Sequence, residues 1–174
     1  MVSCRSITEP TTSRFSLEKK DTPGAVVTYS SGCCEGYTLL NRATTTVLID
    51  MNGTIIHRWP SHYPQPAKML PGGSIIAGSK FRLFGLGCGD FTYLNEYDWN
   101  GSIVWSYHNW EDGRARQHHD FEREGNPVGY YAPGQDFLEY GNTLVLAHQT
   151  MINTSISRRP LKDDVIYEVD WNGT

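Results

Sequence analysis

Residues 96–107 read EYDWNGSIVWSY, and the chain contains closely similar stretches at two other places. Residues 48–59 read LIDMNGTIIHRW, and residues 168–174 read EVDWNGT. Each stretch has an Asp, a large apolar residue, Asn-Gly, and then Ser or Thr. Asn-Gly between runs of β-branched and aromatic residues is a strong hairpin signal, because a type I′ turn needs positive φ at both central residues. The three stretches therefore predict one two-stranded unit that is used three times.

The spacing of the three copies indicates a repeat architecture. The interval is 48 residues from Asp50 to Asp98 and 72 residues from Asp98 to Asp170. A period of about 40–50 residues with several strands in each repeat is typical of a propeller blade. The second interval is 24 residues longer, which we assign to an insertion at residues 122–137, EREGNPVGYYAPGQDF.

Gly-containing turns followed by short apolar strands recur out of phase with the Asn-Gly hairpins. They lie at residues 70–76 (LPGGSII) and 139–146 (EYGNTLVL). One repeat then consists of an inner strand, a Gly turn, a second strand, a loop, a third strand, an Asn-Gly turn and an outer strand. This order predicts an all-β fold, namely a β-propeller of four-stranded antiparallel blades.

The length of the chain limits the number of blades. A propeller of four to eight blades needs about 190–380 residues, whereas this chain has 174. We expect about three blades of a larger propeller in residues 25–174, interrupted within a blade, and a flexible N-terminal arm in residues 1–24. Open strand edges pair readily with other chains, so a homo-oligomer formed through these edges is a further expectation.

Composition excludes several classes of protein. The formal charge is −4, without a stripe of Lys and Arg or an apolar run of membrane-spanning length, so we expect neither a nucleic-acid nor a membrane partner. No secretory signal is recognisable, and a cytoplasmic location is the default expectation. The Gly-rich residues 81–90 lack the Lys-Ser/Thr of a phosphate loop. The cysteines lack metal-ligand spacing, and both free thiols and a disulfide from Cys33 or Cys34 to Cys88 remain open.

The richest polar stretch is RARQHHDF at residues 114–121. His118 and His119 directly precede a predicted inner strand, and the inner strands of a propeller surround its central channel. An imidazole there can act as a nucleophile or a general acid or base, a guanidinium such as that of Arg116 can hold an oxyanion, and Asp120 can fix a His tautomer. Paired His followed by Asp also suggests a metal, although a third ligand at short spacing is missing. Structural, catalytic and metal-binding roles therefore stay open. His148 either faces the same channel mouth or is a structural histidine.

Several motifs in the same order resemble the arylsulfotransferase (aryl-sulfate sulfotransferase) family, from about Gly36 to Thr174. They are YTLLN, VLIDMNGTIIHRW, MLPGGSII, NEYDWNGSIVWSY, HHDFEREGNPVGYYAPG, GNTLVLAH and DDVIYEVDWNG. The resemblance implies a six-bladed propeller that binds an aryl sulfate in its channel. It also implies transfer of the sulfuryl group to a phenol through a sulfohistidine, without a nucleotide donor, cofactor or metal.

The resemblance also implies roles for individual residues. The HHD element assigns catalytic roles in sulfate binding or acid–base chemistry to His118 and His119. Arg116, Asp120 and His148 are expected at the substrate, Arg116 and His148 without support from a motif. The nucleophilic His and the main Arg of the family are expected in later blades, so we expect an incomplete enzyme here.

Two other functions remain open. The chain can be a non-catalytic propeller that binds a partner through the Tyr- and Pro-rich loop at residues 122–137. It can also be a self-associating module whose open edges pair between copies.

Overall fold

The computed structural model describes most of the chain between residues 35 and 173, together with a few residues near the N-terminus. The described ranges are 17–18, 26–27, 32, 35–42, 44–62, 66–79, 90–111, 114–125 and 140–173. These residues form only strands, turns and irregular segments, so the prediction of an all-β fold with antiparallel sheets is confirmed. No helix within them is long and apolar enough to cross a membrane. Most of the expected N-terminal arm, the cysteines of the disulfide question and residues 126–139 lie outside these ranges.

The middle sheet has the strand order that the repeat pattern predicts. Its antiparallel order is β6-β7-β8-β9. The strands are β6 (Ala67–Met69), β7 (Ile75–Ser79), β8 (Tyr93–Tyr97) and β9 (Ile103–Tyr107). Pro71 precedes Gly72, whose φ is +92°, and this is the pattern of a type II turn between β6 and β7. The turn is closed by the amide of Gly73, which donates to the carbonyl of Leu70 at 3.2 Å.

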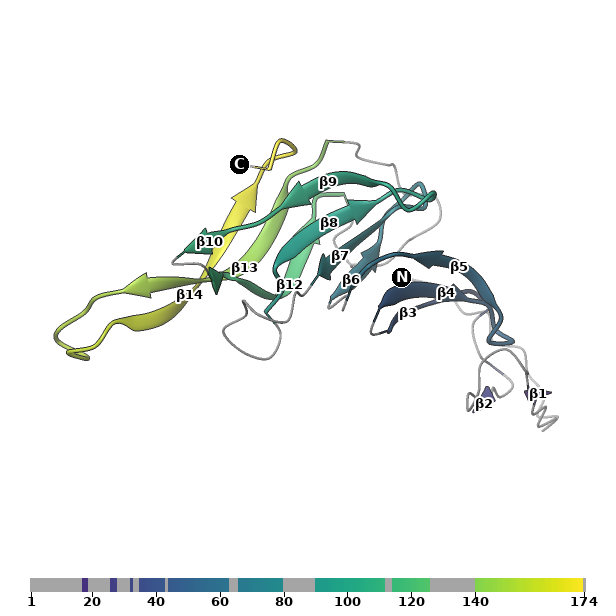
Figure 1. The fold of residues 1–174 in the computed structure, drawn as a ribbon, viewed down its shortest axis with the longest axis horizontal. Helices are drawn as coiled ribbons and strands as arrows, with labels where there is room; N and C mark the ends of the chain where they lie inside the picture. The colour runs from purple at the N-terminus through teal and green to yellow at the C-terminus, as the bar shows by residue number, and fades with distance from the viewer. Residues whose placement is uncertain are drawn as a thin grey trace.

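Two three-stranded sheets flank the middle sheet, and Figure 1 shows the three sheets side by side in chain order. The first contains β3 (Thr38–Arg42), β4 (Thr45–Ile49) and β5 (Ile55–Trp59). The third contains β12 (Gln117–Arg123), β13 (Thr143–Met151) and β14 (Leu161–Val169), and its β13–β14 hairpin extends beyond the other sheets. Two small pairs complete the described strands: β1 (Leu17–Glu18) with β2 (Val26–Val27), and β10 (Trp110–Glu111) with β11 (Arg114–Ala115). The described strands do not close into a ring or barrel.

The Asn-Gly turns follow the predicted positions but not the predicted turn type. In the turn before β9, the amide of Gly101 donates to the carbonyl of Asp98 at 3.0 Å, and Gly101 has a φ of +84°. Asn100 has no positive φ, because His119 is the only described non-glycine residue that does. A type I turn followed by a left-handed Gly has this geometry, so the type I′ prediction is wrong. The Asp98 carboxylate, which accepts the amide of Ser102 at 2.7 Å, supports the longer loop.

Hydrophobic cores lie between neighbouring sheets. Alternate residues of a strand face opposite sides, and β7 is buried along its whole length. Ile75 and Ala77 therefore enter the core shared with the first sheet, whereas Ile76 enters the core shared with the third sheet. The first core contains Leu48, Trp59, Ile75, Ala77 and Tyr97. The second contains Leu70, Ile76, Phe91, Leu94, Trp105, Tyr107, Phe121, Val145 and Val169.

The Asn-Gly turns also contact the neighbouring sheet. The indole Nε1 of Trp59 in β5 donates to the carbonyl of Asp98 at 3.0 Å. A Cβ on Gly101 would lie 3.1 Å from Cδ of Pro60, so this turn packs tightly against the end of β5. The repeated sequence therefore specifies both a hairpin and the contact between one sheet and the next.

Candidate functional site

The HHD element forms a bulge inside β12. Gln117 pairs with Ala147 and Phe121 pairs with Val145, so the three residues from His118 to Asp120 lie opposite Leu146 alone. His119 has a φ of 57°, a left-handed conformation that costs a non-glycine residue about 1–3 kcal/mol. His118 is 3% exposed, whereas His119 is exposed. The sequence placed these histidines before the strand, and the structure places them within it, because the bulge allows the two side chains to leave the strand in different directions.

Two acidic residues and a third histidine stand on the same face of the sheet as His118. His148 of β13 pairs directly with Asp164 of β14. On the other side of β12, Asp90 forms an isolated antiparallel bridge with His118. Directly paired residues on neighbouring strands point to the same face. Asp90, His118, His148 and Asp164 therefore form a row across the strands.

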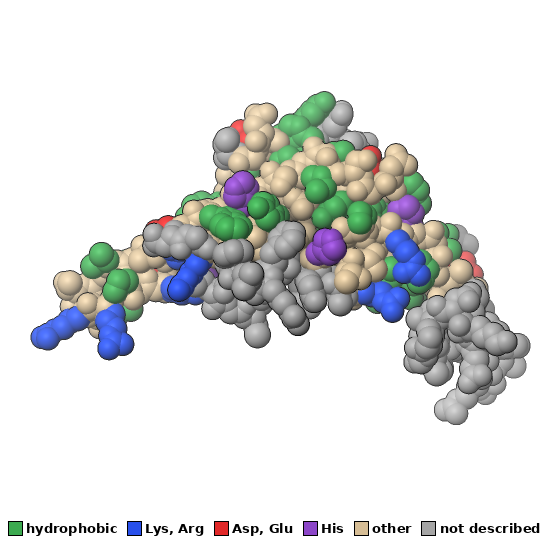
Figure 2. Space-filling model, in the orientation of Figure 1, with side chains coloured by type: hydrophobic (Ala, Val, Ile, Leu, Met, Phe, Trp, Pro, Cys, Tyr) green, Lys and Arg blue, Asp and Glu red, His purple; other side chains and the backbone are tan. Residues whose placement is uncertain are grey.

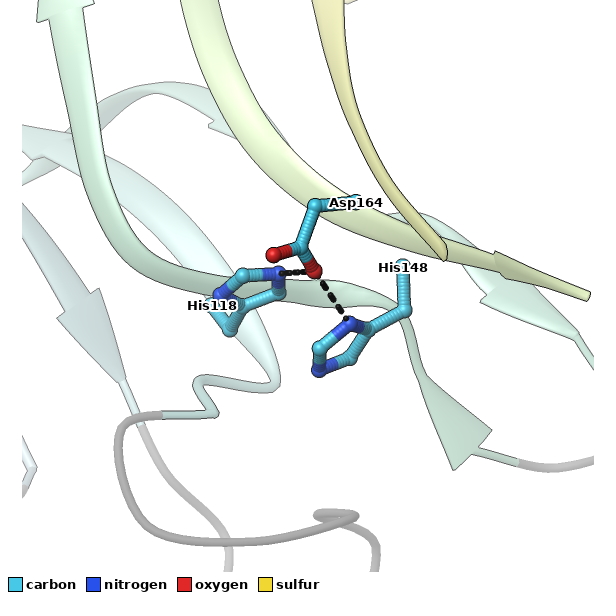
Figure 3. A group of neighbouring side chains, drawn as sticks. All are labelled: His118, His148 and Asp164. Atoms are coloured by element: carbon cyan, nitrogen blue, oxygen red, sulfur yellow. Dashed lines mark hydrogen bonds and ion pairs between the residues drawn. The ribbon is translucent and has the colours of Figure 1, made fainter. Parts of the chain in front are cut away.

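The side chains of this row are in direct contact. The imidazole rings of His118 and His148 stack with centroids 3.8 Å apart and an interplanar angle of 22°. Asp164 Oδ1 lies 3.0 Å from His148 Nδ1 and 3.4 Å from His118 Nε2, and Figure 3 shows the three side chains pointing toward one another. The 3.4 Å contact lacks hydrogen-bond geometry, since His118 Nε2 is buried without a hydrogen-bond partner. On the far side of His148, Nε2 is 3.9 Å from Asp90 Oδ1.

His119 joins this row through a short contact between two ring nitrogens. His118 Nδ1 and His119 Nδ1 are 2.8 Å apart. One of them must carry the proton and the other must accept it, because two protonated or two bare nitrogens would repel each other. If His119 Nδ1 donates, then His118 carries its proton on Nε2, toward Asp164, and His119 Nε2 keeps a free lone pair. The contact therefore couples the tautomers of the two histidines.

The surroundings of His118 favour its neutral form. Burial lowers the pKa of His118, and the neighbouring His148 and His119 lower it further, while Asp164 and Asp90 oppose the shift. A buried imidazole loses the hydration that stabilises its charged form. His118 is therefore a neutral imidazole near pH 7, able to accept a proton or to bind a metal.

Two of the predicted site residues have other partners. Arg116 Nη2 lies 2.5 Å from Glu111 Oε2 and is 7% exposed. Asp120 Oδ1 lies 2.9 Å from Nζ of Lys68 in β6 and accepts the amide of Phe121 at 2.8 Å. Neither side chain contacts the histidine row through these bonds, so the structure brings together His118, His119 and His148 but assigns Arg116 and Asp120 to ion pairs.

Asp164 and Asp90 belong to this row, but the sequence alone does not identify them as site residues. Asp164 is 46 residues from His118 in the chain, and its contact depends on the register of the long β13–β14 hairpin. Asp90 ends the Gly-rich stretch at residues 81–90, where no sequence pattern marks it as a site residue. The residue that pairs with His148 can be identified only when the bounds and the register of β13 and β14 are known.

The site is open on one side. Asp164 is 66% exposed and His148 is 18% exposed, whereas Asp90 and His118 are each 3% exposed. The row thus runs from a buried carboxylate to a solvent-accessible one. The arrangement can relay a proton between imidazoles, and it presents two imidazole nitrogens and a carboxylate oxygen within 4.8 Å of one another. Compared with known proteins, the chain has no significant match among protein-family models, curated proteins or solved structures.

Proposed function

We propose that this chain is part of a histidine-dependent sulfotransferase of the arylsulfotransferase type. The observation that carries the proposal is the Nδ1–Nδ1 contact between His118 and His119 at a strained bulge. Strained backbone conformations cluster at active sites, where the surrounding structure holds a side chain in its working orientation. His119 is exposed, and its Nε2 is the nitrogen that the coupled tautomers leave free. We therefore propose His119 as the nucleophile, in place of the histidine that the family resemblance expects in a later blade.

The proposed reaction has two steps. In the first, the lone pair of His119 Nε2 attacks the sulfur of an aryl sulfate, the bond from sulfur to the aryl oxygen breaks, and a phenolate leaves. In the second, the oxygen of an acceptor phenol attacks the same sulfur, the N–S bond breaks, and the phenol proton is released. Such covalent catalysis replaces one difficult displacement by two easier ones. The contact with neutral His118 supports it, because His118 Nδ1 accepts a hydrogen bond from His119 Nδ1 and so keeps the attacking Nε2 of His119 unprotonated.

The proposed architecture is a β-propeller built from blades of the middle-sheet type. Three observations support it. The three main sheets follow one another in chain order, neighbouring sheets share a core, and the three Asp-x-Asn-Gly turns are each closed by a hydrogen bond from the Gly amide to the Asp carbonyl. In this arrangement β6 and β12 are inner strands, and the bulge at His119 lies where ligands of propellers bind.

The decisive experiment follows sulfuryl transfer from a chromogenic aryl sulfate to a phenol, together with the mass of the protein after exposure to the donor alone. We expect the mass increment of one SO3 group on a peptide that contains His119. The variant His119→Gly removes the imidazole and relieves the positive φ, so it should keep its fold and lose both the label and the transfer. His62→Ala, at an exposed histidine outside the cluster, is the matched control and should keep both.

The proposal is wrong if the donor labels the protein equally in the wild type and in His119→Gly. It is also wrong if transfer proceeds unchanged in the His119→Gly variant. Absence of both label and transfer in the wild type would exclude the chain as a self-sufficient enzyme and favour the second candidate function.

A specific observation favours self-association as that second function. Leu144 and Ile166, on the face of the third sheet that is turned away from the second core, are 47% and 68% exposed. Strand β14 is also the edge of its sheet, and Figure 2 shows hydrophobic and basic side chains at the end of the β13–β14 hairpin. Exposed apolar faces and open edges mark interaction sites. Sedimentation at increasing concentration should then reveal an oligomer that Ile166→Lys weakens, and an Ile166→Lys variant that sediments like the wild type would count against it.

A further inference from the structure

The side chains of His118, His148 and Asp164 have the composition of a transition-metal site, which goes beyond the proposed transfer. We infer that these three residues bind one first-row divalent transition metal ion, for which zinc is the natural probe. Two imidazoles and one carboxylate form the ligand set of open zinc sites and of some iron(II) sites. Neither the family resemblance nor the pattern of the HHD element assigns this site, because its third ligand comes from β14.

The distances between the ligand atoms suit a small ion. Ligand atoms bound tetrahedrally at about 2.0–2.1 Å lie roughly 3.3–3.4 Å apart. Asp164 Oδ1 lies 3.4 Å from His118 Nε2 and 3.0 Å from His148 Nδ1. The three ligand atoms all lie within 4.8 Å of one another, so small rotations of two rings would complete the site. Asp164 is 66% exposed, which leaves a path for the ion from solvent.

A buried ring nitrogen of His118 without a hydrogen-bond partner faces the same site. His118 Nε2 has no hydrogen-bond partner although its side chain is 3% exposed. A buried polar atom without a partner loses about 1–3 kcal/mol of hydrogen bonding, and a metal bond to this nitrogen would recover it. Asp90 Oδ2 is likewise buried without a hydrogen-bond partner.

The second nitrogen of each imidazole already faces a partner. Ring nitrogens that do not bind the metal usually donate to a carboxylate or another acceptor, which fixes the ring and its tautomer. His148 Nε2 faces Asp90 Oδ1 at 3.9 Å, and His118 Nδ1 contacts His119 Nδ1 at 2.8 Å. With the metal on His118 Nε2 and His148 Nδ1, both outer nitrogens carry protons, so that His118 can donate to His119 and the protonated Nε2 of His148 faces the carboxylate of Asp90.

The charge of the cluster is also suited to a divalent cation. With neutral imidazoles, the row holds two carboxylates, Asp90 and Asp164, and two basic side chains in or next to neighbouring described strands are bound elsewhere. Lys68 pairs with Asp120 and Glu122, and Arg116 pairs with Glu111. A single divalent ion would neutralise the row.

The test is calorimetric titration of the chelator-treated, dialysed protein with zinc, cobalt(II) and magnesium. We expect one site for zinc and cobalt, visible absorption bands from bound cobalt, and no binding of magnesium, which avoids imidazole ligands. Asp164→Asn and His148→Gln should each weaken zinc binding by more than about tenfold, and Asp90→Asn by about 10–100-fold through the orientation of His148.

Asp163→Asn is the matched control. Asp163 is the exposed neighbour of Asp164, and its Oδ1 accepts the amide of Asp164 at 3.1 Å, a bond that an asparagine oxygen can keep. This variant should bind zinc like the wild type. Because Asp164 is exposed, Asp164→Asn should leave the fold intact. Circular dichroism of this variant in the presence of a chelator checks that it is folded.

Three results would overturn the inference. The first is a wild-type protein that binds neither zinc nor cobalt. The second is zinc binding that is equal in the wild type and in Asp164→Asn and His148→Gln, which would place the ion elsewhere, for example on cysteines. The third is binding of magnesium as strong as that of zinc. Because these titrations contain no aryl sulfate, failure of the metal site and failure of the proposed transfer are separate results.

Discussion

Substitution of Arg123 by Met should destabilise the fold severely, because it breaks a buried ion pair between two sheets. Arg123 of β12 and Glu96 of β8 are 3% and 4% exposed, and Arg123 Nη1 lies 3.2 Å from Glu96 Oε2. Nε of Arg123 donates to Thr143 Oγ1 at 2.7 Å. The guanidinium also stacks on the rings of Trp105 and Trp171, with its Cζ 4.8 Å and 5.1 Å from their centroids.

The expected loss follows from the charge that stays behind. Methionine retains most of the apolar stem and can contact the two Trp rings, so the main effect is an uncompensated Glu96 carboxylate. Removal of one partner of a buried ion pair costs about 3–5 kcal/mol. Glu96→Gln should also destabilise, since it leaves the guanidinium buried. The double variant should be more stable than the sum of the two single effects by about 0.5–3 kcal/mol.

Urea unfolding followed by circular dichroism measures these differences. Arg114→Met is the matched control, because Arg114 is exposed in β11, and surface substitutions usually change stability by less than about 0.5 kcal/mol. If Arg123→Met were as mild as the control, or if the two single effects simply added, the ion pair would not join the sheets as described.

Three further predictions concern the turn contacts and the histidine row. Gly101→Ala should lower the thermal midpoint, since φ is +84° and the new Cβ would lie 3.1 Å from Pro60, and an unchanged midpoint would refute the close packing. Trp59→Phe removes the hydrogen bond to the carbonyl of Asp98 and part of a fully buried indole, so it should cost more than about 1 kcal/mol in urea unfolding, whereas no loss would refute the close contact between the sheets. Because the pKa of His118 is lowered in the folded state, protonation favours the unfolded chain. In the presence of a chelator, the free energy of unfolding should therefore fall as the pH drops below about 6.5. The His118→Gln variant should show a smaller fall over the same pH range.

The order of the strands could be predicted because it depends on local sequence signals. The Asn-Gly and Pro-Gly turns each involve residues that are close in sequence, and the middle sheet follows them from β6 to β9. The turn type could not be predicted as easily. Both turn types place Gly at a left-handed position, and they differ in whether the preceding Asn is left-handed as well. The Asp98 carboxylate, which binds the amide of Ser102, is the local feature that accompanies the longer loop.

The sequence predicted the three histidines of the site but not its two carboxylates. His118 and His119 are neighbours, and their pairing attracts attention in the sequence alone. Arg116 and Asp120 looked equally suitable, but Glu111 and Lys68 bind them. Lys68 lies 52 residues before Asp120, so this ion pair depends on the packing of one sheet against the next. Sequence spacing gives candidates for a site, whereas long-range pairing decides which of them are available.

The proposed transfer and the inferred metal site depend on the position of one proton. For transfer, His119 Nδ1 donates to His118 Nδ1, so that His119 Nε2 keeps the lone pair that attacks sulfur. A metal on His118 Nε2 forces the opposite arrangement, because the ring must then carry its proton on Nδ1 and donate it to His119 Nδ1. His119 would in turn carry its own proton on Nε2 and could no longer attack. If both inferences hold, zinc inhibits the transfer and a chelator restores it. Because Asp164→Asn releases the metal but leaves His118 and His119 in place, that variant should resist the inhibition.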